Sequence, residues 1–184
     1  MLIIKEDNRV YLIESTYSYS SYGEQDQALI SENMPIFRAY KSKILIGGDC
    51  IPDLEAIRYL RLPLPKELSA VNLVSKTVPA IKSILQELGR LDKNSAMSNI
   101  VFAKADKVLS LTPNSAIREI FKEEAIGWQD DRLRYALAIT EGMPLDERIQ
   151  KIYKIVGKIL GVNMFPLIMM DSTSFKLKII EEKK

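Results

Sequence analysis

LIIKEDNRVYLIES, the segment from Leu2 to Ser15, has the pattern of two strands joined by a tight turn. Leu2–Lys5 and Val10–Ile13 are apolar and rich in β-branched residues, which favour an extended backbone. Glu6–Arg9 between them consists of polar residues that suit a turn. The segment therefore predicts an N-terminal β-hairpin.

Three later segments predict hairpins by the same pattern of apolar runs around a short polar turn. They are residues 34–46, 99–111 and 164–180. Gly47 and Gly48 follow the first of these and are expected to break the sheet, with a tight turn into a helix. Neither glycine belongs to a phosphate-binding GxxxxGK[ST] or GxGxxG motif. Residues 117–126 predict one further extended stretch, which Gly127 ends.

Apolar residues recur at helical spacing in the segments between the hairpins. The predicted helices cover residues 52–62, 69–88, 130–139 and 145–159. Pro79 is expected to kink or restart the second helix, and Gly161 to close the last. Asp130 and Asp131 suit the positive N-terminus of the third helix, a better explanation of this adjacent pair than a metal site.

The composition excludes several classes of function. The chain has 184 residues, 47% hydrophobic and 27% charged, which predicts one globular domain over residues 1–184. A net charge of +2 argues against nucleic acid or a membrane as the default partner. The absence of histidine excludes Ser-His-Asp, Cys-His and HExxH chemistry. Cys50, the only cysteine, favours a structural thiol in a reducing cytoplasm, and no apolar stretch is long enough to cross a bilayer.

The order of the elements predicts the fold class. Two hairpins are followed by two helices, a hairpin with an extra strand, two more helices and a last hairpin. Antiparallel strands interleaved with helix pairs favour an α+β protein, a four-layer αββα sandwich of two antiparallel sheets flanked by helix pairs.

Several segments, in this order and spacing, resemble the proteasome β-subunit and HslV-like family of the N-terminal-nucleophile hydrolase fold. The resemblance covers nearly the whole chain. Its segments are the opening hairpin, IFRAYKSKILIGGDCIPDLEAIRYL, IVFAKADKVLSL, EAIGWQDDRLRYALAIT and MPLDERIQKIYKIVGKI. The resemblance implies a scaffold that assembles into rings through its helices and sheet edges.

The resemblance also implies a site that can be compared residue by residue. Members that cleave peptides use an N-terminal threonine whose α-amine is the general base, so they need no histidine. This chain begins with Met1, and the family's aspartate falls at about Ser15. The family's lysine falls at Pro35, and its serine after the Ile-Gly pair at Trp128 or Gln129. These positions of a vestigial site supply none of the catalytic groups, and we expect neither a cofactor nor a metal.

A catalytically silent subunit with a structural or assembly role is therefore expected, in a homo-oligomer, with a regulatory ATPase or an active paralogue as further partners. Two alternatives stay open. A threonine- or serine-type peptidase would need a start upstream of Met1, or internal processing before Ser15, Thr16 or Ser18. A small-ligand binding domain would reuse the old cleft, lined by Trp128 and a tyrosine cluster consisting of Tyr17, Tyr19 and Tyr22.

Two composition features have a structural and a functional interpretation. Residues 15–23, STYSYSSYG, suit an extended ribbon or a mobile loop, and less readily a phosphosite cluster or a binding strip. Lys151, Lys154 and Lys158 lie at helical spacing, which indicates a solvated face rather than a cationic binding strip.

Overall fold

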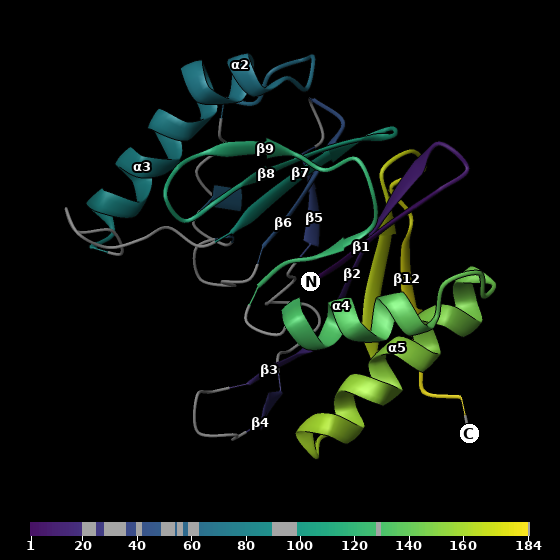
Figure 1. Ribbon diagram of the computed structural model, residues 1–184. Coiled ribbons are helices and arrows are strands. Elements are labelled where there is room, and N and C mark those ends of the chain that lie inside the picture. Colours follow the sequence, from purple (N-terminus) through teal and green to yellow (C-terminus); the bar gives the residue numbers. More distant parts are fainter. Residues whose placement is uncertain are drawn as a thin grey trace.

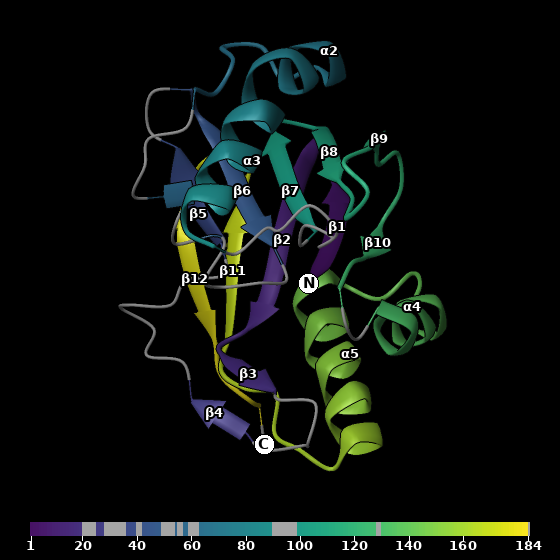
Figure 2. The same cartoon turned by 90° about the vertical axis from the view of Figure 1, so that its left-hand side faces the viewer.

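The computed structural model describes residues 1–19, 25–27, 36–39, 42–48, 54, 57–58, 63–89, 99–127 and 130–183. Within these ranges the strands form two antiparallel five-stranded sheets and a separate two-stranded ribbon (Figure 1). Helices lie on opposite sides of the two sheets in both views (Figure 2). The prediction of two antiparallel sheets flanked by helices is therefore confirmed.

The first sheet contains β1 and β12, the first and last strands of the described residues, and has the strand order β10-β1-β2-β11-β12. Its strands are β1 (Leu2–Glu6), β2 (Arg9–Ser15), β10 (Glu124–Ala125), β11 (Leu167–Asp171) and β12 (Leu177–Ile180). The opening hairpin pairs Leu2 with Ile13 and Glu6 with Arg9. Asp7 and Asn8 form its two-residue turn with φ of 49° and 59°. Positive φ at both central positions matches the right-handed twist of the strands, and Asp and Asn tolerate it better than most residues.

The second sheet has the strand order β5-β6-β7-β8-β9. Its strands are β5 (Ile36–Ala39), β6 (Ile44–Gly48), β7 (Ile100–Lys104), β8 (Lys107–Leu111) and β9 (Ile117–Glu119). The ribbon pairs β3 (Tyr17–Tyr19) with β4 (Gln25–Gln27). Part of the Ser/Tyr-rich segment is thus extended, the first of the two structures predicted for it.

Two helical layers cover the sheets. One consists of α2 (Ala70–Asn72), the π-helical turn η1 (Leu73–Thr77) and α3 (Val78–Glu87). The other consists of α4 (Asp130–Ile139) and α5 (Leu145–Leu160). Pro79 lies in the first turn of α3, directly after the π turn. The predicted restart of the helix at this proline is therefore confirmed. Proline has no N–H to donate to the preceding turn, so the regular helical hydrogen bond is missing at this residue. Gly161 ends α5 with a φ of 72°. No helix in the described part of the chain is long and apolar enough to cross a membrane.

The four layers follow from three apolar clusters in the described part of the chain. Leu2 and Ile4 of β1 face α5, whereas Met1 and Ile3 face the second sheet, because successive side chains of a strand point to opposite faces. The second sheet buries its other face against α3, where Ile81 is fully buried. This arrangement is the predicted αββα sandwich.

Two sequence predictions were wrong in detail. Gly47 and Gly48 do not break the sheet: both belong to β6, where they pair with Val101 and Ile100. Residues 117–126 are not one extended stretch, because β9 lies in the second sheet and β10 in the first. The chain crosses between the sheets at residues 120–123. The helix predicted over 52–62 lies outside the described residues except at Leu54, Ile57 and Arg58, which are helical.

Gly48→Ala is expected to lower the free energy of unfolding by about 1–3 kcal/mol, because the added methyl group overpacks the strand. A Cβ at this position would lie 2.8 Å from the Asn99 carbonyl oxygen and 3.1 Å from Leu54 Cδ2. The oxygen is backbone and cannot turn aside as a side chain would. Urea unfolding of the variant checks this, and a wild-type midpoint would show that the close approach is absent.

Candidate functional site

The chain's α-amine is buried at the start of β1, the position where the family resemblance places the nucleophile. Met1 is buried, with 4% of the residue exposed, and its ammonium forms an ion pair of 2.6 Å with Glu14 Oε2. It also donates a hydrogen bond of 2.7 Å to the Ile126 carbonyl, and Ile126 N–H donates in return to Met1 O at 2.9 Å. The amine is therefore held between the end of β2 and the residue that follows β10.

Glu14 is the site residue that the sequence analysis missed. Its carboxylate bridges two groups, since Oε1 accepts a hydrogen bond of 2.9 Å from Ser15 N–H while Oε2 holds the amine. The available signal was a single acidic residue directly after the apolar run Val10–Ile13. Glu14 therefore links the amine at the start of β1 to the backbone at the end of β2.

Ser15, where the resemblance places an aspartate, is the last residue of β2 and is 4% exposed. Its Oγ donates a hydrogen bond of 2.8 Å to the Met164 carbonyl. Thr16 Oγ1 donates to the Pro166 carbonyl at 2.9 Å. Both hydroxyls hold β2 against the segment that leads into β11, a structural use that accounts for their burial.

Tyr153 of α5 closes the site from the helical side. It is fully buried, and its hydroxyl donates a hydrogen bond of 2.9 Å to the Ile13 carbonyl. Burial raises the pKa of Tyr153 well above its ordinary value of 10.0, and the nearby charge of Glu14 raises it further. A hydrogen bond from Leu2 N–H opposes these effects only in part. Tyr153 therefore stays protonated while the protein is folded.

The raised pKa predicts a loss of stability at alkaline pH. Above about pH 10 the tyrosine of the unfolded chain ionises while the folded one does not, so unfolding is favoured by about 1.4 kcal/mol per pH unit. Tyr153→Phe is expected to cost about 1 kcal/mol near neutral pH, where only the hydrogen bond is lost. That cost should disappear by about pH 11, because the wild-type protein loses stability above pH 10 through the ionisation of this tyrosine in the unfolded chain, and the variant does not. Urea titrations across this range check it, and a cost independent of pH would contradict it.

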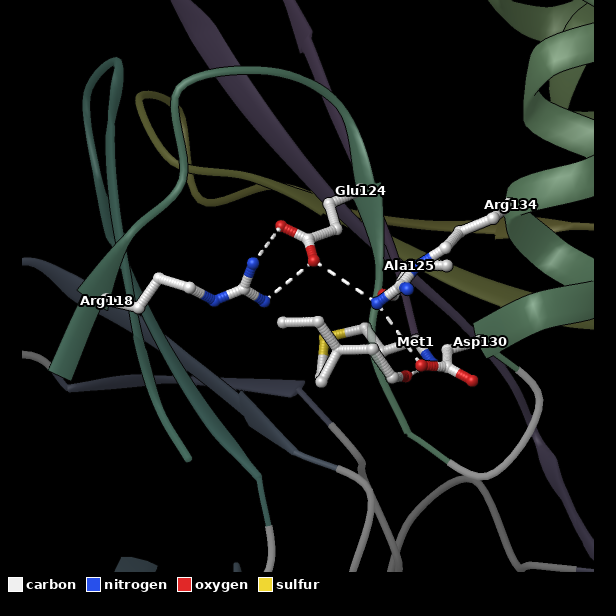
Figure 3. A network of polar contacts seen from close by, with 7 residues as sticks. Met1, Arg118, Glu124, Ala125, Asp130 and Arg134 are labelled. Carbon is white, nitrogen blue, oxygen red and sulfur yellow. Dashed lines mark hydrogen bonds and ion pairs between the residues drawn. The ribbon is translucent and has the colours of Figure 1, made fainter. Parts of the chain in front are cut away.

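A network of charged side chains lies beside Met1 (Figure 3). Arg118 of β9 binds Glu124 of β10 through two hydrogen bonds, of 2.9 and 2.7 Å. Arg134 of α4 lies 3.3 Å from the same carboxylate and 3.2 Å from Asp130. The network joins the second sheet, the first sheet and α4. Asp130 is the first residue of α4 and has an arginine partner, consistent with the structural role predicted for it.

Several predicted positions cannot be placed. Pro35, Trp128 and Gln129 lie outside the described residues, as do Cys50 and Tyr22. The side chains of Tyr17, Ser18 and Tyr19 also lie outside them. Of the vestigial site, the structure brings together Met1 and Ser15 through Glu14. The described residues contain no group of three or more acidic or cysteine side chains suited to a metal ion.

Comparison with known proteins places the fold. No protein-family model matches the sequence, and no curated protein matches it either. Among solved structures, Thiobacillus denitrificans BPH in complex with epoxomicin has a TM-score of 0.71 and 14% identity, covering 100% of this chain and 98% of that one. Eukaryotic HslV from Trypanosoma brucei has a TM-score of 0.60 and 13% identity, covering 92% and 97%. Anbu, the ancestral beta-subunit, from Yersinia bercovieri has 0.64 and 10%, covering 99% and 87%.

These matches extend over almost the entire chain at low identity, so they establish architecture rather than activity. They agree with the two antiparallel sheets and the helical layers described above. The chain has the fold of proteasome β-subunits, the N-terminal-nucleophile hydrolase fold.

Proposed function

We propose that this chain is a catalytically silent proteasome-like subunit with a structural or assembly role. The observation that carries the proposal is the ion pair between the Met1 ammonium and Glu14, which is 2.6 Å long and buried at the amine. An amine held in this way serves as a structural cation. Met1 stands where the resemblance places the nucleophile, and a methionine thioether is not a nucleophile of the kind that acyl transfer needs.

The neighbouring position supports the same conclusion. The resemblance assigns an aspartate to the place of Ser15, and a serine hydroxyl cannot supply a carboxylate's charge. Ser15 Oγ already donates to the Met164 carbonyl. Losing one member of a coupled catalytic set commonly lowers the rate by several orders of magnitude, so the combined replacements leave little activity.

Assembly is the role that remains for such a scaffold. We propose a homo-oligomer, ring-like as in the family that the sequence resembles, with a regulatory ATPase or an active paralogue as further partners. The single cysteine fits a reducing compartment, and we propose the cytoplasm as its location.

Epoxomicin and fluorogenic peptides test the silent site. BPH, which has the same fold, has been solved in complex with epoxomicin, so BPH serves as the positive control. We expect this protein to retain no epoxomicin in an intact-mass spectrum and to hydrolyse a panel of fluorogenic peptides no faster than buffer. Hydrolysis that epoxomicin blocks, on a protomer beginning with serine or threonine, would establish the peptidase alternative instead.

A further inference from the structure

We draw no further inference here: the strongest candidate, the outer edge of the first sheet, where Leu177 and Ile179 of β12 are 43% and 45% exposed, is an apolar sheet face for which nothing in the described part of the chain shows what covers it.

Discussion

Glu14→Ala is expected to lower the free energy of unfolding by about 3 kcal/mol, because removing one partner of a buried ion pair leaves the other charge uncompensated. Met1 is 4% exposed and the hydrogen bond of its amine to Ile126 is buried, so little water reaches the amine to replace the lost carboxylate. The Ile126 carbonyl, at 2.7 Å, would be the remaining acceptor. Urea unfolding of the purified variant measures the effect.

Two further variants separate the ion pair from the general effect of removing an acid. Glu6 lies in the same hairpin, is exposed and has no ion pair among the described residues, so Glu6→Ala should change stability by less than about 0.5 kcal/mol. Glu14→Gln keeps hydrogen-bonding oxygen but no charge, and should fall between the two alanine variants. Equal effects of Glu14→Ala and Glu6→Ala would show that the amine is not held by Glu14.

Arg148→Ala is expected to cost a similar amount, about 3 kcal/mol, for a related reason. The side chain is 9% exposed, binds Glu123 through two hydrogen bonds of 2.7 Å and donates to the Leu137 carbonyl at 3.3 Å. Its removal leaves the Glu123 carboxylate, which is 26% exposed, without its ion-pair partner. The crossover between the sheets is then no longer bonded to α5. The loss of the buried aliphatic stem adds to the cost.

Arg132→Ala on α4 is the matched control, since Arg132 is exposed and has no ion pair among the described residues. We expect a change below about 0.5 kcal/mol for this variant. The double variant Arg148→Ala/Glu123→Ala should recover part of the lost free energy of unfolding, because it leaves no charge without a partner. If Arg148→Ala unfolds at the wild-type denaturant concentration, the crossover is not fixed by this pair.

The hairpins could be predicted because their signals are local. Asp7 and Asn8 lie between two apolar runs, and the strands on either side follow directly. The helix from Leu145 to Leu160 could also be predicted, since its apolar stripe and the Gly161 that ends it lie within one segment. Local pattern also allowed the order of elements, and hence the αββα sandwich, to be inferred.

Features that depend on distant contacts could not be predicted. Gly48 has the residue type of a strand breaker, but it pairs with Ile100 in β6. The Asn99 carbonyl comes too close for a Cβ at this position, a contact that only the folded structure reveals. Residues 117–126 look uniformly extended, and only the packed sheets determine where the chain passes from one to the other.

The candidate site was predicted in part. Ser15 was identified as a replaced position, and it lies at the end of β2 beside the amine's partner. Glu14 was missed because the comparison with the family looked for a carboxylate one residue later. Its role depends on an amine whose other partner, Ile126, is 125 residues away along the chain, a contact that no local pattern reveals.

Native mass spectrometry of the untagged protein tests the proposed silent subunit most directly, because one spectrum gives the mass of the protomer and of its assembly. We predict a protomer that retains Met1, with the 20.9 kDa mass of the full sequence, in a closed homo-oligomer. A protomer trimmed to begin at Ser15, Thr16 or Ser18 would contradict the account, since processing there would expose an N-terminal hydroxyl and remove the Met1–Glu14 ion pair.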